Sequence, residues 1–481
     1  MRKQMKIAAV VSATALLAIG ASFASMAASK TGTWAQDGDN WYCYDKEGDA
    51  YEAEFCTFEG KDYYVGDDGI MLTNSWVDYD GAMYYVGETG AKTTNAWMDL
   101  IPHNDEDAEE ERYWFKSSGK MAKNEKIVID GKTYYFGNEG QMLTGWVDTA
   151  AFDEATSTTN AVYCDEEGAR LAKTWVETTV PGADEDETDE FWYYIGSKGA
   201  VTTGKAKSIS GNTYLFNGEG QMLSGWVANI ATSGNAVYDE VGGEGSTFAL
   251  AAGKEVYFCG DSDDGHVKKD QWIKEWKPSQ FFAEDADKDQ YWYYIGKDGQ
   301  VFVPTTTTTA NAMKFFDAED KEIKVNGDAY QAAIKEIDDK YYVFNAAGEM
   351  KSGLIRISGG VNYFGGADDG ARKTGSFVIA DEYGVEGKFL FSTATADKYV
   401  GVTGPKSGKL YKDGLLITAT DYKYAVEEVA GNNYIVNGSG SIQTTQKIYK
   451  DGDVEITNAE TATFSAGKAG EAPKGAVTGL K

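Results

Sequence analysis

The chain has 481 residues, of which 42% are hydrophobic and 13% aromatic, and this composition excludes an intrinsically disordered polymer. Its formal net charge of -31 excludes the basic surfaces through which proteins bind nucleic acid or anionic membranes. The 56 glycines, against only 6 prolines, indicate many tight turns rather than stiff linkers.

The first segment, residues 1–28, has the pattern of a secretion signal peptide. Basic residues at positions 2, 3 and 6 precede a mostly apolar run over 7–19, and Ala27 and Ala28 offer small side chains for cleavage. The apolar run is too short to span a bilayer comfortably, and no later stretch is apolar enough to do so. We therefore expect a secreted chain with no membrane insertion once the signal is removed.

A repeated pattern dominates the next region, 29–300. An aromatic pair, a glycine turn, a methionine and a Gly-Trp step occupy 131–146 and return in the same order at 211–226. Each unit joins a run of high β-propensity to turn residues and a return strand, which predicts a β-hairpin. Because a single hairpin is only marginally stable in water, we expect an all-β solenoid of stacked hairpin repeats of about 20 residues.

Acidic insertions interrupt this region at 105–111, 184–190 and 284–289, each just before an aromatic cluster. We expect solvated loop insertions that separate neighbouring units. Residues 261–265 are also acidic, but their spacing does not fit a helix-flanked calcium loop, so no metal site is predicted.

The composition changes after residue 300. All 12 tryptophans lie between Trp34 and Trp292, and a threonine run occupies 305–309. These observations predict a Thr-rich linker at 301–310 and a degenerate repeat region without tryptophan at 311–461. The last segment, 462–481, is rich in glycine, alanine and lysine and is expected to be a flexible tail.

Neither the cysteines nor the histidines indicate catalysis. Cys43, Cys56, Cys164 and Cys259 have no metal-ligand spacing; Cys43 and Cys56 could form a local disulfide in an oxidising space, or all four could be reduced, half-buried thiols. His103 and His266 are expected in exposed loops, and hydrolase and phosphate-binding motifs are absent from the sequence. The sequence therefore predicts no catalytic residues, no cofactor and no enzyme activity.

The unit at 131–146 resembles the cell-wall-binding repeat of Gram-positive surface proteins, also called the choline-binding or glucan-binding repeat. Further copies lie at 211–226 and, with Ser75 in place of the glycine, at 62–76. The resemblance implies a hairpin solenoid held noncovalently at the cell surface. In this family, aromatic cages between adjacent hairpins hold the quaternary ammonium of choline, and related repeats hold neutral sugar chains.

The resemblance also implies which residues form the cages. The Gly-Trp step is complete only at Trp146 and Trp226, where we expect a partly exposed indole and the best binding. The methionines and many of the tyrosines are expected in the core. The candidate ligand-binding residues are Trp76, Tyr85, Trp97, Trp114, Tyr135, Trp146, Trp175, Trp192, Tyr194, Trp226, Trp292 and Tyr294.

These observations favour a non-catalytic, secreted protein at the surface of a Gram-positive bacterium. Its expected partner is the choline of cell-wall teichoic acid or an extracellular glycan, bound with avidity by repeated weak sites. A structural adhesin stalk or host-facing surface rod with vestigial cages is the alternative, and a glycan hydrolase is a weaker third hypothesis. Exposed terminal hairpins are compatible with a homodimer.

Overall fold

The computed structural model describes residues 29–184, 186–243, 245–280, 289–316, 322–325, 329–380, 384, 386–419 and 423–481. The predicted signal peptide, 1–28, lies outside these residues. Apart from one 3-10 turn, η1 (Pro278–Gln280), every regular element in the described ranges is a β-strand, so the all-β prediction is confirmed. Across the same ranges, no helix has the length and apolarity needed to cross a membrane.

The strands up to residue 295 are short. They are β1 (Lys30–Thr31), β2 (Thr33–Asp37), β3 (Asn40–Tyr44), β4 (Glu54–Phe58), β5 (Lys61–Val65), β6 (Ser75–Tyr79), β7 (Ala82–Val86), β8 (Ala96–Leu100), β9 (Glu111–Phe115), β10 (Glu125–Ile129), β11 (Lys132–Phe136), β12 (Gly145–Asp148), β13 (Asp153–Glu154), β14 (Ala161–Cys164), β15 (Thr174–Thr178), β16 (Phe191–Ile195), β17 (Gly204–Ile209), β18 (Asn212–Phe216), β19 (Gly225–Asn229), β20 (Tyr238–Glu240), β21 (Val256–Cys259), β22 (Gln271–Glu275) and β23 (Tyr291–Ile295).

The later strands include longer ones. They are β24 (Thr308–Phe316), β25 (Glu322–Val325), β26 (Tyr330–Ile337), β27 (Lys340–Asn345), β28 (Met350–Lys351), β29 (Leu354–Ile357), β30 (Gly360–Tyr363), β31 (Gly375–Ala380), β32 (Glu386–Phe391), β33 (Gly404–Lys406), β34 (Lys409–Lys412), β35 (Leu415–Leu416), β36 (Tyr424–Val429), β37 (Asn432–Asn437), β38 (Lys450–Asp451), β39 (Val454–Glu455), β40 (Thr463–Phe464) and β41 (Val477–Thr478).

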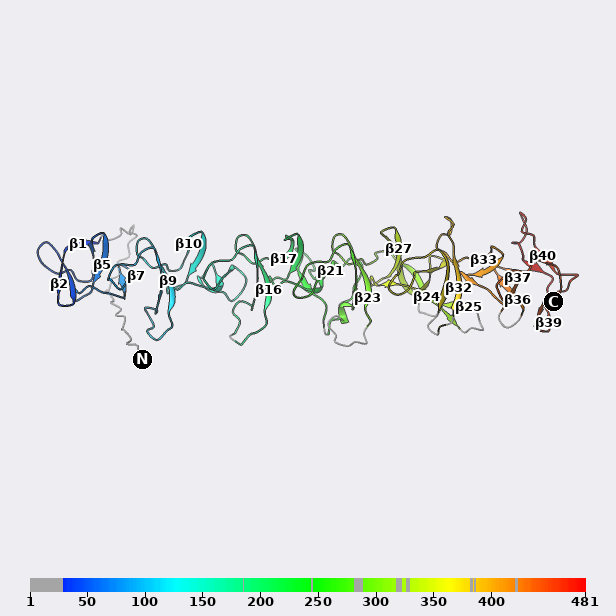
Figure 1. Cartoon of the computed structure of the whole chain (residues 1–481), viewed down its shortest axis with the longest axis horizontal. Coiled ribbons are helices and arrows are strands. Elements are labelled where there is room, and N and C mark those ends of the chain that lie inside the picture. The colour runs from blue at the N-terminus through cyan, green and yellow to red at the C-terminus, as the bar shows by residue number, and fades with distance from the viewer. Residues whose placement is uncertain are drawn as a thin grey trace. The chain divides into compact units, whose positions relative to one another are not determined.

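The chain divides into two compact units. One comprises Met1–Ala206 and Phe216–Met222, and the other comprises Lys207–Leu215 and Leu223–Lys481. Within each unit most strands pair antiparallel with the strand next in the chain and form hairpins (Figure 1). The exceptions include β1, which pairs parallel with β4, and β24, which also pairs with β26 and β29. The predicted series of hairpins is therefore confirmed.

Two predicted boundaries are wrong. The segment 301–310 is not a linker, because Val301 is buried and β24, which begins at Thr308, pairs with β26 and β29. The segment 462–481 is not a free tail, because it contributes β40 and β41 and buries Ala462 and Val477 beside Tyr449. In both segments a few apolar side chains pack against a neighbouring strand, and composition alone does not predict this packing.

A short connector joins each hairpin to the one before it through the backbone. After β11, the Met142 N–H donates to the Arg112 carbonyl of the preceding hairpin at 2.8 Å, and the Leu143 N–H donates to Tyr135 of its own hairpin at 2.9 Å. In the second unit, Val301 and Phe302 repeat this pair of bonds to Val256 and Tyr294. Because these bonds need no particular side chain, stacking survives wide variation in sequence.

Two turn glycines lie directly beside a methionine of the preceding connector. Gly140 and Gly168 have positive φ values of 91° and 79°, a conformation that favours glycine. A Cβ added at either would lie 2.3 Å from the methionine of the previous connector, Met121 Cε in the first case and Met142 Sδ in the second. Each turn glycine thus makes room for the methionine of the repeat before it.

The acidic insertions lie at hairpin tips. The first lies between β8 and β9 and the second between β15 and β16, while residues 281–288 of the third lie outside the described ranges. The prediction that they separate neighbouring units is wrong, because the Met121 N–H still reaches the Met83 carbonyl of the previous hairpin at 2.8 Å. An insertion at a tip lengthens a hairpin without disturbing its backbone hydrogen bonds to the neighbouring hairpin.

Candidate ligand-binding frames

The strand register defines a recurring three-residue arrangement, here called a frame. Its first member is the tryptophan on the first strand of a hairpin, and its second lies two residues before the cross-strand partner of that tryptophan. The third member is a tyrosine on the second strand of the following hairpin. For β2–β3, where Trp34 pairs with Cys43, the frame consists of Trp34, Trp41 and Tyr63.

Three frames have an indole capped by the chain itself. The indole N–H of Trp76 donates to the Ile101 carbonyl at 3.0 Å, that of Trp146 to Thr179 at 3.0 Å, and that of Trp226 to Trp276 at 2.9 Å. Each acceptor is the residue directly after the first strand of the next hairpin, where that hairpin extends into its long tip. The long tips therefore begin as caps over the preceding tryptophan.

The capped frames also lack a second aromatic wall. Their second members are Met83, Ala161 and Val256, and their tyrosines, Tyr113, Tyr193 and Tyr293, stand about edge-on to the indole at 5.0–5.1 Å. Edge-to-face packing of this kind stabilises a core. We infer that the capped frames are structural.

Four frames remain half-exposed, and their tryptophans are Trp34, Trp97, Trp175 and Trp272. In three of them the second member is another tryptophan, namely Trp41, Trp192 or Trp292. In the fourth it is Arg112. The tyrosine of the next hairpin lies 5.6 Å from Trp34, 4.9 Å from Trp97 and 4.7 Å from Trp272, measured between ring centroids.

The first open frame forms a pocket of about 190 Å³. Trp41 and Phe58 stand at the surface with 39% and 46% of their area exposed. The Trp34 indole N–H is buried and makes no hydrogen bond to the described residues. The lining residues are Trp34, Trp41, Phe58, Tyr63, Met71 and Thr89.

The structure divides the predicted site residues into distinct environments. The predicted exposure of Trp146 and Trp226 is wrong, because they are only 6% and 0% exposed under their caps. Trp76 is also capped, with Tyr85 buried against it, and Tyr135 packs with Val147 on a separate core. Of the remaining predicted residues, Trp97 and Trp175 are first members and Trp192 and Trp292 are second members of open frames, whereas Tyr194 and Tyr294 are the cross-strand partners of Trp175 and Trp272. Trp114, the cross-strand partner of Trp97, is buried in the core with only 8% of its area exposed.

Sequence reasoning missed the first pocket and Trp272. The signal was present, because Trp41, Trp192 and Trp292 are each the second residue of the second strand of their hairpin, two positions before the partner of a first-strand tryptophan. Trp146 and Trp226 have the complete Gly-Trp step but have Ala161 and Val256 at this second position. In the structure, the residue at the second position separates capped frames from open ones.

Tyr294, the cross-strand partner of Trp272 in one open frame, has a phenol that is neutral at physiological pH. Burial raises the pKa of Tyr294 to about 12, and the hydrogen bond from its hydroxyl to Asp270, at 2.8 Å, acts in the same direction. Tyr294 therefore presents a neutral ring beside Trp272, at 5.4 Å between centroids.

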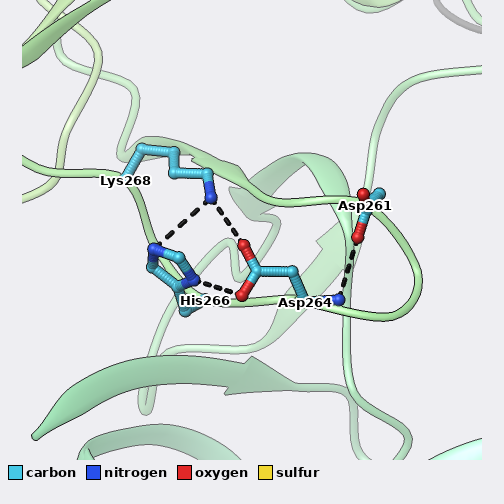
Figure 2. Close-up of polar contacts among 4 residues, drawn as sticks. All are labelled: Asp261, Asp264, His266 and Lys268. Carbon is cyan, nitrogen blue, oxygen red and sulfur yellow. Dashed lines mark hydrogen bonds and ion pairs between the residues drawn. The ribbon is translucent and has the colours of Figure 1, made fainter.

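The titratable groups outside the frames have structural roles. The Asp264 carboxylate lies between the Lys268 ammonium, at 2.6 Å, and the His266 ring, while the Asp264 N–H donates to Asp261 at 2.9 Å (Figure 2). Burial alone raises the pKa of Asp264, but the bonds from Lys268 and His266 lower it below its usual range. His266 is thus half-buried in a connector, and the predicted exposed loop position is wrong.

The four cysteines are free and buried. Burial raises the pKa of the Cys43 and Cys56 thiols, which hydrogen bond to each other, and raises that of Cys164 to about 12. In the described part of the chain, no group of three or more histidine, cysteine or acidic side chains could hold a metal ion.

Comparison with known proteins identifies the repeats. Residues 58–91 and 107–145 match models of the choline-binding repeat. Glucosyltransferase-S of Streptococcus mutans is 26% identical over 47% of this chain and 12% of its own length, and Glucosyltransferase-I of Streptococcus downei is 26% identical over 54% and 18%. The chain therefore spans less than a fifth of the length of these relatives.

Three similar solved structures are of proteins from Streptococcus pneumoniae. CbpJ is 17% identical, with a TM-score of 0.34 over 72% of this chain and 100% of its own. Choline binding protein F is 17% identical, with a TM-score of 0.28 over 74% and 98%, and the modular autolysin LytC is 16% identical, with a TM-score of 0.31 over 71% and 52%.

Proposed function

Because the chain carries choline-binding repeats, we propose that it is a non-catalytic, exported surface protein that binds a cell-envelope polymer or extracellular glycan through its open frames. Repeats of this type are binding modules. The observation that carries the proposal is the aromatic pocket of the first frame, which is accessible and of small-molecule size.

The chemistry of this pocket suits a quaternary ammonium group. Such a cation cannot donate hydrogen bonds, so it is best held by aromatic faces and a polarisable thioether. The walls supplied by Trp34, Trp41 and Tyr63 match that need, and Met71 adds the thioether. Each cation–π contact is worth about 0.5–2 kcal/mol, and the strongly acidic chain favours a cationic ligand further.

Avidity would then depend on the number of open frames. A single weak pocket gives little retention, whereas several pockets engaging one repetitive polymer raise the apparent affinity by orders of magnitude. The ligand would be a choline-substituted teichoic acid, present in many copies on one wall. This arrangement supports placement at a Gram-positive cell surface without a covalent bond.

A glucan-like polysaccharide is the second candidate ligand. The two relatives named above are called glucosyltransferases. Sugar rings stack their C–H faces on exposed indoles such as Trp41, so the same frame suits them. Competition between choline and glucan oligosaccharides separates the two.

The test is a titration of the full chain with choline chloride, and separately with glucan oligosaccharides, followed by calorimetry. Trp41→Ala removes an exposed pocket wall, and we expect it to weaken the first site at least tenfold. Val128→Ala changes an exposed side chain on β10 outside any frame and should bind like the wild type.

Two outcomes would contradict the proposal. If neither ligand binds to the wild type, binding through the frames is rejected. If Trp41→Ala binds as the wild type does, the first pocket is rejected as a site. Turnover of wall or glucan substrate by the purified chain would reject the non-catalytic part alone.

A further inference from the structure

Arg112 occupies the position that a tryptophan holds in the other open frames. In β2–β3, Trp41 lies across the strands from Gln36, and in β8–β9 Arg112 lies across from Asp99 in the same register. Both residues lie two positions before the partner of the frame's first tryptophan. The frame of Trp97 therefore has a cation where the first pocket has an aromatic wall.

The guanidinium of Arg112 lies on the face of the Trp97 indole. Its central carbon is 5.2 Å from the ring centroid, within the range of a cation–π contact. Asp99 holds the side chain from the other strand, with the Arg112 Nε and the Asp99 Oδ1 3.8 Å apart. Among the described residues, no lysine or arginine lies over Trp34 or Trp41 in this way, whereas in the Trp272 frame the Lys274 ammonium lies 5.7 Å from the centroid of Trp292, the second member.

We propose that Arg112 is a specificity-determining residue that excludes quaternary ammonium ligands from the Trp97 frame. A ligand cation would have to displace the guanidinium from the indole or sit beside it, and like charges at this separation repel. The Trp97 frame also has one aromatic wall fewer than the first frame. The inference rests on the proposed function, because it concerns which open frames accept a cation.

The inference predicts a gain of binding. Arg112→Trp removes the internal cation and restores the missing wall opposite Asp99, as in the first frame. We expect the full-length variant to bind one more choline per chain than the wild type, measured by calorimetry. Arg112→Ala removes the cation without adding a wall and is the matched control, expected to gain no site of comparable affinity.

A double variant tests where the new choline site lies. Adding Trp97→Ala to Arg112→Trp should abolish the gain, because the new ligand would rest on that indole. Circular dichroism checks that the tryptophan variant folds. If it folds poorly, Arg112→Tyr places a smaller ring at the same exposed position, and the same gain of binding is expected from it.

The two hypotheses fail on different measurements. A folded Arg112→Trp or Arg112→Tyr variant with the same choline stoichiometry as the wild type overturns the role of Arg112. The proposed function fails instead when the wild type binds neither choline nor glucan oligosaccharides. An extra site in Arg112→Trp supports the role of Arg112 whatever the wild type binds.

Discussion

Individual tryptophans of this chain have different roles although their local sequences are alike. Trp146 follows a complete Gly-Trp step and is buried under the Thr179 carbonyl, whereas Trp41 lies on a short hairpin and is largely exposed. A buried indole with a satisfied N–H contributes to stability, and an exposed one beside a pocket contributes to binding. Exposure, rather than motif quality, therefore predicts the effect of substitution.

Trp146→Ala should destabilise the first unit by about 3–5 kcal/mol, because it leaves a cavity among buried aromatic side chains and an unsatisfied carbonyl. Trp41→Ala should cost about 1 kcal/mol or less. Urea unfolding of both variants measures the difference. Equal losses of stability would contradict the division into capped and open frames.

A second residue-scale prediction concerns Glu349, which is buried against Lys351 at 2.7 Å and Lys277 at 3.0 Å. Burial alone raises the pKa of Glu349, but the two lysines outweigh burial and lower it below its usual value. Because the folded-state pKa is the lower one, its contribution to stability is present above the usual glutamate pKa of about 4.3 and is lost as the pH falls through the lowered value.

The comparison between wild type and Glu349→Gln tests this sign. At pH 7 the variant should be less stable, and the difference should shrink as the pH is lowered from about 5 to about 3. Thermal unfolding followed by far-ultraviolet circular dichroism at each pH measures it. A difference that stays constant or grows toward acid would show that the lysines do not control this carboxylate.

At the scale of the element, the hairpin and its connector form the repeating unit. The connector bonds two hairpins through backbone groups, and its large side chain covers the turn glycine of the next repeat. The covering side chain varies, because it is methionine over Gly140 and Gly168, lysine over Gly119 and arginine over Gly199. Turn glycines with similar φ values therefore differ in which side chain lies next to them.

Gly168→Ala and Gly131→Ala separate backbone strain from packing. Both glycines have φ near +80°, so each alanine should cost about 1–2 kcal/mol. Only at Gly168 would the new Cβ meet Met142, since nothing lies within 4 Å of a Cβ at Gly131. We expect Gly168→Ala to lose a further 1–3 kcal/mol or so in urea unfolding, and equal losses would argue against the contact.

At the scale of the whole molecule, each hairpin contacts mainly its neighbours in sequence, and two compact units are present. Stability in such chains is a sum of local and nearest-neighbour contributions, so unfolding need not be a single event. All tryptophans lie between 34 and 292, whereas strands continue to residue 478. Fluorescence and circular dichroism therefore observe different parts of the chain.

We expect urea unfolding curves from tryptophan fluorescence and from far-ultraviolet circular dichroism to differ in midpoint. Superimposable curves at several protein concentrations would indicate that the chain unfolds as one cooperative unit.

The sequence by itself determined the all-β class, the hairpin as the repeating unit and the resemblance to choline-binding repeats. These depend on local properties, namely β-propensity, turn glycines and the spacing of aromatics, as in residues 131–146. It did not determine which tryptophans are accessible. Trp146 and Trp226 carry the best local motif, yet the next hairpin covers them with a carbonyl that lies 33 or 50 residues further along the chain.

Only the tertiary structure decided this, because the burial of an indole depends on what packs above it. The same holds for segments 301–310 and 462–481, whose apolar residues join sheets formed by distant strands. The cross-strand register likewise places Arg112 over Trp97, at the position that Trp41 occupies in the first frame. Local chemistry specifies a hairpin, whereas contacts between hairpins determine which of its aromatic residues a ligand can reach.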